Sequence, residues 1–154
     1  MCGIVGYAGE KEAFPILLNG LKKLEYRGYD SAGIAIFNHE IKVFKQCGKV
    51  ADLEKSCSGG IPSGSLGIGH TRWATHGEPN DTNAHPHTSA SGLFSIVHNG
   101  IVGNYPVLKD DLEKNGFTMR SDTDTEVLAN LIEYFYLQDD SIDAETGIRM
   151  ALSK

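Results

Sequence analysis

The strongest constraint on the fold is a pair of apolar segments that only three residues separate. The segments AGIAIF (32–37) and IKVFKQ (41–46) are rich in β-branched and aromatic side chains, and Asn38, His39 and Glu40 lie between them. Two strands joined by so short a connection form an antiparallel hairpin. A parallel pair needs a long crossover between its strands. The sequence therefore predicts an antiparallel sheet.

Further strands and helices are predicted in separate blocks around this hairpin. Strands are expected at 4–8, 65–73, 93–100 and, briefly, 117–120. Apolar residues at helical spacing predict helices over about 11–26, 50–57 and 106–116. Another helix is expected after Thr123, where Thr123 and Glu126 form a capping box, and a last one in DAETGIRMALSK (143–154). The arrangement indicates an α+β fold with helices outside antiparallel sheets.

Composition excludes several classes of function. Hydrophobic residues make up 40% and charged residues 22% of the chain, as in ordinary globular proteins. The net charge of -6 argues against binding to nucleic acid. No signal peptide or run of membrane-spanning length is visible, and the three cysteines match no disulfide or zinc pattern. We therefore expect a cytoplasmic protein that binds no membrane, with Cys47 and Cys57 as packing residues.

The opening segment MCGIVGYAG gives Cys2 two possible roles. Free cysteine packs well in cores, and position alone favours that role. Alternatively, Met1 is removed because the side chain behind it is small. Cys2 would then carry a thiol and a free α-amine on one residue.

Histidines are concentrated between residues 70 and 87, where His70, His76, His85 and His87 occur. Histidine is a frequent metal ligand, and Asp81 could join two of these side chains. Their spacing matches no common metal motif, however, and no cysteine lies among them. The alternative is a set of residues that hydrogen-bond a substrate or the backbone, and we expect no metal.

Asn99 and Gly100 follow the apolar run LFSIV directly. Asn-Gly is a common turn dipeptide. An Asn side-chain amide beside an unobstructed Gly N–H also provides two donors for one developing oxyanion. The local sequence leaves both readings open.

Arg72 and Asp124 form a second pair with two interpretations. An acidic residue in the first turn of a helix stabilises the helix dipole without any other role. An α-amino acid substrate, however, needs a fork donor for its carboxylate and an acceptor for its ammonium group. Arg72 and Asp124 supply these two groups.

Several long motifs occur in order, and together they are highly specific. They are MCGIVGY, LEYRGYDSAG, GIGHTRWATHGEPN, NAHPH, VHNGIV and SDTDTEV, and they run from residue 1 to about 137. This series resembles the class II glutamine amidotransferases, which are N-terminal-nucleophile (Ntn) hydrolases beginning with cysteine. The segment HTRWATHG is similar to the family's sugar-phosphate branch, the glutamine–fructose-6-phosphate aminotransferases, rather than to the amidophosphoribosyltransferases.

The resemblance implies a four-layer αββα sandwich of antiparallel sheets with outer helices. Residues 1–154 are expected to be a glutaminase domain that is truncated at its C-terminus and lacks the sugar isomerase domains. Its implied activity is hydrolysis of L-glutamine, which delivers ammonia for glucosamine 6-phosphate synthesis. Fructose 6-phosphate would bind only to the absent domains, no cofactor is needed, and a homodimer is possible. The alternatives are an amidophosphoribosyltransferase-like glutaminase and a catalytically silent glutamine-binding fragment.

The resemblance also implies roles for individual residues. Cys2 is the nucleophile, with its own α-amine as general base, and Asn99 and Gly100 hold the oxyanion. Arg72 binds the substrate carboxylate and Asp124 its ammonium group. A loop that closes over glutamine, and its surroundings, are expected to contribute the substrate-binding residues Trp73, Thr75, His76 and His85. Two further residues, Arg27 and Gly28, are expected to orient the N-terminus.

Overall fold

Four antiparallel strands form the main sheet of the protein. They are β1 (Gly3–Ala8), β2 (Ser31–Asn38), β3 (Glu40–Cys47) and β4 (Leu66–Arg72), in the order β1-β4-β2-β3. The computed structural model describes residues 2–60, 63–73 and 78–154. The expected hairpin is confirmed, because β2 pairs with β3 from Ser31↔Cys47 to Asn38↔Glu40. His39 makes the turn alone, at a positive φ of 62°.

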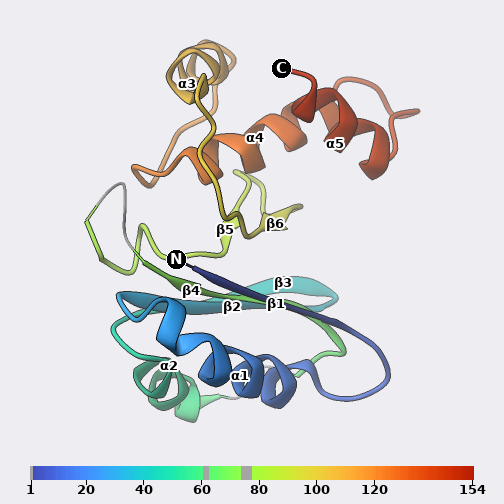
Figure 1. Ribbon diagram of the computed structural model, residues 1–154. Coiled ribbons are helices and arrows are strands. Elements are labelled where there is room, and N and C mark those ends of the chain that lie inside the picture. The colour runs from blue at the N-terminus through green and yellow to red at the C-terminus, as the bar shows by residue number, and fades with distance from the viewer. Residues whose placement is uncertain (1, 61–62, 74–77) are drawn as a thin grey trace. The chain divides into compact units, whose positions relative to one another are not determined.

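Two helices cover one face of this sheet, as Figure 1 shows. They are α1 (Ala13–Leu24) and α2 (Val50–Ser56), each followed by a short 3-10 turn, at Glu25–Arg27 and Cys57–Gly59. Leu17, Leu21 and Leu53 are 0% exposed and pack against the sheet in a single hydrophobic core. The periodic apolar residues of the sequence therefore identify this helix layer correctly.

The two remaining cysteines differ in environment. Cys57 lies in the core at 1% exposure, and burial raises the pKa of its thiol. The expected packing role is confirmed for Cys57. It is wrong for Cys47, which is exposed at the end of β3, with its thiol near the carbonyl oxygens of Asp30 and Pro79.

A second compact unit is rich in helices. The chain divides into one unit that runs to Pro86 and includes Ile96–Asn99, and another formed by His87–Ser95 and Gly100–Lys154. In the second unit α4 (Asp124–Tyr136) packs against both α3 (Tyr105–Lys114) and α5 (Ala144–Leu152). The short strands β5 (His87–Thr88) and β6 (Ser95–Ile96) pair with each other.

Buried polar side chains of α4 hold the turn between β5 and β6. The Asn130 side-chain oxygen accepts a hydrogen bond from the Ala90 N–H at 2.8 Å. The Glu133 carboxylate, on a residue only 2% exposed, accepts from both the N–H and the hydroxyl of Ser91. Polar residues on the buried face of α4 therefore accept hydrogen bonds from backbone groups of this turn, which the two-residue strands β5 and β6 leave unpaired.

Three local expectations differ from the structure. The strand expected at 93–100 is restricted to Ser95–Ile96, and 117–120 is not a strand. The capping box is only half formed: Thr123 accepts from the Glu126 N–H, but the Glu126 carboxylate binds the N–H groups of Arg120 and Ser121, at 2.8 and 2.6 Å. A buried side chain thus replaces a strand partner for this segment.

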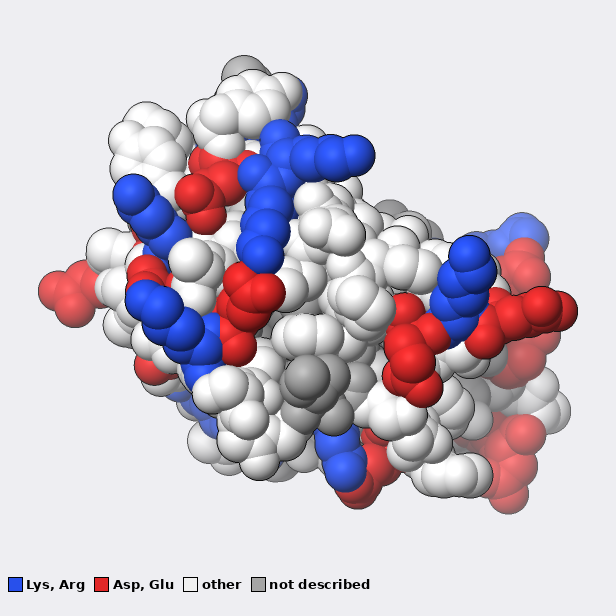
Figure 2. All heavy atoms as spheres, turned by 90° about the horizontal axis from the view of Figure 1, so that it is seen from below, with Lys and Arg blue, Asp and Glu red and all other residues white. Residues whose placement is uncertain are grey.

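Charges of both signs are mixed on the surface seen in Figure 2, where Lys and Arg side chains lie among Asp and Glu. One such pair joins the two helices of the first unit, with Lys22 Nζ 2.7 Å from the Glu54 carboxylate. This face does not present the continuous basic surface that nucleic acid binding requires. Among the described residues, none of the helices has both the length and the apolar character needed to cross a membrane.

Candidate active site

Sheet register determines where Cys2 lies. Gly3 at the start of β1 pairs with Thr71 of β4, so Cys2 lies beside the end of β4. The Trp73 N–H donates to the Cys2 sulfur at 3.2 Å, and the thiol lies 3.7 Å from the Trp73 carbonyl oxygen. Cys2 as a residue is partly exposed. It is therefore held at the strand end, and a reagent can still reach it.

Arg27 and Gly28 fix the chain around this thiol. The Arg27 Nε donates to the Cys2 carbonyl oxygen at 3.4 Å. Gly28 is buried against the backbone of the β4 end: a Cβ there would lie 2.7 Å from the Arg72 carbonyl carbon and 2.9 Å from the Trp73 nitrogen. Only a residue without a side chain permits this approach. The YRG segment thus supports the backbone amide that holds the sulfur.

Asn99 also reaches the first residues of the chain. Its Nδ2 donates to the Cys2 carbonyl oxygen at 3.3 Å. Its Oδ1 lies 2.8 Å from Nε2 of His70. An amide nitrogen carries two hydrogens, so the bond to Cys2 leaves a second N–H for a developing negative charge. The structure gives the Asn99 side chain one polar neighbour on each side.

His70 is buried in the middle of this arrangement. It lies in β4 at 1% exposure, and its ring stacks on that of His85 with centroids 4.4 Å apart. Burial lowers the pKa of His70 to about 4, and the hydrogen bonds to the Asn99 side chain and the His98 backbone, which raise this pKa, offset only part of the effect. The imidazole is therefore neutral at physiological pH.

His85 is brought to this cluster by the close approach of two backbones. A Cβ atom at Gly33 would clash with the His85 carbonyl oxygen, so the two backbones can come this close only at a glycine. Gly33 is the β2 partner of His70 in the sheet register. His85 is 6% exposed, and its Nδ1 accepts from the His98 N–H at 3.4 Å.

The end of β4 carries two further expected residues. Arg72 is 5% exposed, and its Nη1 donates to the Glu78 carbonyl oxygen at 3.5 Å. The Trp73 ring is 43% exposed and makes an edge contact with Tyr29, with centroids 5.4 Å apart. Thr75 and His76 lie outside the described residues.

Gly100 and Asp124 belong to the second unit. Gly100 is exposed and follows Asn99 directly in the chain. Asp124 begins α4, where its Oδ2 accepts from the Val102 N–H at 2.7 Å and its Oδ1 from the Thr125 hydroxyl at 3.2 Å. The Asp124 carboxylate therefore anchors the segment that follows Gly100.

No individual role was predicted for His70, which was considered only together with the other histidines, as a metal ligand or a hydrogen-bonding residue. The structure joins Cys2, Arg27, Trp73 and Asn99 within one unit and adds His70 as the partner of the Asn99 amide. The signal was the position of His70 inside an apolar strand, where a polar side chain needs a partner. Among the described residues, no three His, Cys, Asp or Glu side chains lie close enough to hold a metal ion.

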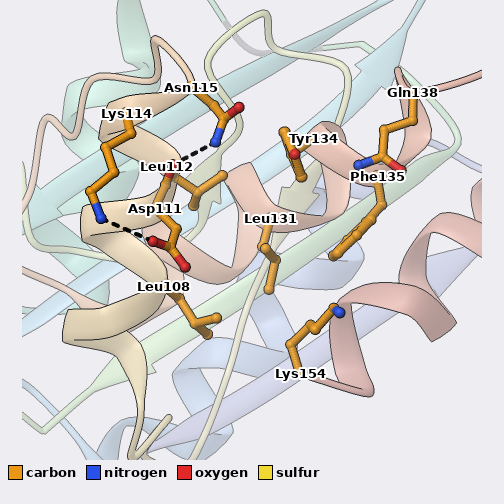
Figure 3. Close-up of a pocket in the computed structure, with 10 residues that line it drawn as sticks. All are labelled: Leu108, Asp111, Leu112, Lys114, Asn115, Leu131, Tyr134, Phe135, Gln138 and Lys154. Atoms are coloured by element: carbon orange, nitrogen blue, oxygen red, sulfur yellow. Dashed lines mark hydrogen bonds and ion pairs between the residues drawn. The ribbon is translucent and has the colours of Figure 1, made fainter.

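A cavity of about 440 Å³ lies in the second unit, and it contains none of the expected site residues. Figure 3 shows Lys114 and Asn115 of the α3 end bonded to Asp111, opposite Tyr134 and Phe135 of α4. The residues that line this cavity include no Cys, Ser or Thr, the usual nucleophiles of acyl transfer.

Comparison with known proteins decides the family. A model of the glutamine amidotransferase domain matches residues 56–139, which is more than half of the chain. The chain belongs to the glutamine amidotransferase domain family. This membership confirms the resemblance that the ordered motifs indicate.

Curated relatives in this family share about half of their aligned residues with the chain. The glutamine–fructose-6-phosphate aminotransferase (isomerizing) of Bacteroides thetaiotaomicron is 52% identical over 100% of this chain and 25% of its own length. The protein of the same name from Caldanaerobacter subterraneus subsp. tengcongensis is 59% identical over 88% of this chain and 22% of its own length. The chain thus spans about a quarter of the length of the relatives it matches.

Solved structures confirm the fold class. A glutamine phosphoribosylpyrophosphate amidotransferase from B. subtilis, complexed with ADP and GMP, matches with a TM-score of 0.81 at 29% identity, over 99% of this chain and 32% of that one. A structure described as the allosteric regulatory enzyme of purine biosynthesis matches with a TM-score of 0.83 at 29% identity, over 99% and 33%. The chain has the α+β fold of the Ntn amidotransferases, as the resemblance implies.

Proposed function

We propose that residues 1–154 form a glutaminase domain in which Cys2, after removal of Met1, hydrolyses the side-chain amide of L-glutamine. The observation that carries this proposal is the contact of Cys2 with both Trp73 and Asn99. These contacts bring a thiol nucleophile and a side-chain amide donor to the same residue, and acyl transfer uses a nucleophile and an oxyanion donor of this kind.

The chemistry begins with proton transfer from the thiol to the α-amine of Cys2. An α-amino group titrates near about 8, so a useful fraction is neutral and basic at physiological pH. The thiolate attacks the glutamine amide carbon, and the carbonyl oxygen becomes an oxyanion. The Asn99 side chain and the Gly100 N–H donate to it. Ammonia leaves after accepting the proton, and water then hydrolyses the Cys2 thioester to give glutamate.

Substrate recognition is assigned to two charged side chains, one at the end of β4 and one at the start of α4. Arg72 supplies a guanidinium fork for the α-carboxylate, and Asp124 accepts hydrogen bonds from the α-ammonium group. Trp73, Thr75, His76 and His85 complete the glutamine site, and Arg27 and Gly28 orient the nucleophile.

The use of the ammonia is inferred from the relatives. Those at 52–59% identity are named glutamine–fructose-6-phosphate aminotransferase, whereas the phosphoribosylpyrophosphate enzyme is 29% identical. In the longer protein, we infer, the ammonia aminates fructose 6-phosphate to give glucosamine 6-phosphate, through domains beyond this chain.

The test combines intact mass with labelling by 6-diazo-5-oxonorleucine, an electrophilic glutamine analogue. We expect a mass without Met1, one label per chain and no label in Cys2→Ala, which should retain glutamine binding. Cys47→Ala is the matched control, because Cys47 is more exposed than Cys2, and the variant should still be labelled. Glutamine hydrolysis that persists in Cys2→Ala would contradict the mechanism. In the intact protein, glutamine consumption that depends on phosphoribosylpyrophosphate rather than on fructose 6-phosphate would contradict the assigned branch.

A further inference from the structure

We propose that His70 is a positioning residue that turns the Asn99 side-chain amide so that its nitrogen faces Cys2; this rests on the proposed function above. His70 does not touch the substrate in this role. It acts through the 2.8 Å contact between its Nε2 and the Asn99 Oδ1.

The two ends of the Asn99 amide have different neighbours. One end meets the Cys2 carbonyl oxygen, which can only accept hydrogen bonds. The amide nitrogen must therefore point to Cys2, and the amide oxygen must point to His70. In the flipped orientation two oxygens would face each other, and no N–H would be available for an oxyanion. Catalysis by Asn99 thus requires one orientation of two that have nearly the same shape.

His70 selects this orientation only if its Nε2 carries a proton. A protonated Nε2 donates to the Asn99 oxygen, whereas a bare Nε2 would attract the Asn99 nitrogen instead. Because burial lowers the pKa of His70 to about 4, the neutral ring has a single N–H to place, and both the Asn99 side chain and the His98 backbone are hydrogen-bond partners of this ring. The contacts of Asn99 with both neighbours are satisfied together only when that N–H is on Nε2.

Packing prevents His70 from changing its position. Its backbone lies in β4, paired with Ile4 of β1 on one side and Gly33 of β2 on the other. Its ring is 1% exposed and stacks on His85 with an interplanar angle of 21°. The donor that orients Asn99 is therefore held by the sheet and by a second ring, independently of any ligand.

The decisive variant is His70→Phe, which keeps an aromatic ring against His85 and removes both ring nitrogens, the Nε2–H among them. We expect kcat for glutamine hydrolysis to fall at least 10-fold while KM changes less than 3-fold. The maximal rate of inactivation by 6-diazo-5-oxonorleucine should fall in parallel. His70→Gln retains an N–H donor near the Nε2 position and should recover part of kcat.

Leu53→Ala is the control for lost stability, because Leu53 is fully buried in the same unit and does not contact Asn99. It should destabilise the protein and leave kcat unchanged. A folded His70→Phe protein with kcat within 2-fold of wild type would overturn the proposal. So would an equal loss of kcat in Leu53→Ala.

The wild-type protein offers a measurement that needs neither folding of a variant nor activity. Long-range ¹⁵N–¹H NMR correlations of the His70 ring should show the proton on Nε2. A proton on Nδ1 with a bare Nε2 would overturn the positioning role, whatever the enzyme does. Absence of glutamine hydrolysis in the processed wild type would instead contradict the proposed function, so the two failures are distinguishable.

Discussion

Replacement of Gly28 by alanine should displace the end of β4 and with it the amide that holds the Cys2 sulfur. The φ of Gly28 is -171°, which is extended backbone that any residue adopts, so the cost is steric alone. The new Cβ would lie 2.7 Å from the Arg72 carbonyl carbon and 2.9 Å from the Trp73 nitrogen. Carbon atoms prefer separations of about 3.5–4.0 Å, so the strand end must move by roughly 1 Å.

Overpacking of this kind typically costs about 1–3 kcal/mol. We expect the free energy of unfolding of Gly28→Ala in urea to fall by that amount, followed by circular dichroism and by the fluorescence of Trp73, the chain's single tryptophan. Because Trp73 N is 3.2 Å from the Cys2 sulfur, the rate of Cys2 labelling by 6-diazo-5-oxonorleucine should also fall.

Gly6→Ala is the matched control, because a Cβ at Gly6 of β1 meets nothing within 4 Å. Its free energy of unfolding should stay within about 0.5 kcal/mol of wild type. If Gly28→Ala has the same free energy of unfolding and the same rate of Cys2 labelling as the wild type, the close approach of the two backbones has no energetic importance. That result would refute the steric explanation.

Three further predictions concern charged and titratable groups. Glu126→Ala should lower the free energy of unfolding by about 1–3 kcal/mol in urea denaturation, because the Arg120 and Ser121 N–H groups and the Ser121 hydroxyl lose the carboxylate that accepts from them; a loss below about 0.5 kcal/mol would contradict this. Asp124→Asn can still accept from the Val102 N–H but lacks the charge, so steady-state kinetics should show KM for glutamine raised by roughly 30-fold, or about 2 kcal/mol; an unchanged KM would make Asp124 purely structural. The folded-state pKa of His70 is lowered from 6.5 to about 4, so the unfolded chain takes up a proton on this residue at a higher pH than the folded protein does. The free energy of unfolding is therefore highest above about pH 6.5 and falls by up to about 3 kcal/mol as the pH falls towards 4. The difference in unfolding free energy between wild type and His70→Phe should therefore change across this pH range, and a constant difference would contradict the buried neutral imidazole.

Local sequence patterns were sufficient for the elements that carry their own periodicity. The hairpin of β2 and β3 follows from the short separation of two apolar segments, and the apolar faces of α1 and α4 follow from apolar residues at helical spacing. The segment 93–100 was harder, because its apolar residues resemble a strand although only Ser95–Ile96 find a partner. Pairing is a property of the neighbouring chain, and a single segment does not contain it.

The candidate site shows the same division. Cys2 and Asn99 were predicted from their residue types and the family motifs, and in the structure the Asn99 side chain donates to the Cys2 carbonyl oxygen. The proposed role of His70 could be inferred only from the structure, because it depends on contact with the Asn99 amide, 29 positions later in the chain. Glu126 illustrates the point for side chains: the capping-box pattern was present, yet its carboxylate binds the preceding loop.

The strand order has a consequence for synthesis of the protein on the ribosome. In the main sheet β1 pairs only with β4, although β2 and β3 are made in between. At typical rates of about 5–20 residues per second, the ribosome needs several seconds to pass from the end of β1 to β4. The first residues of the nascent chain have no sheet partner in that interval. The proposed removal of Met1 therefore has an interval, before β4 is made, in which the residues of β1 have no sheet partner.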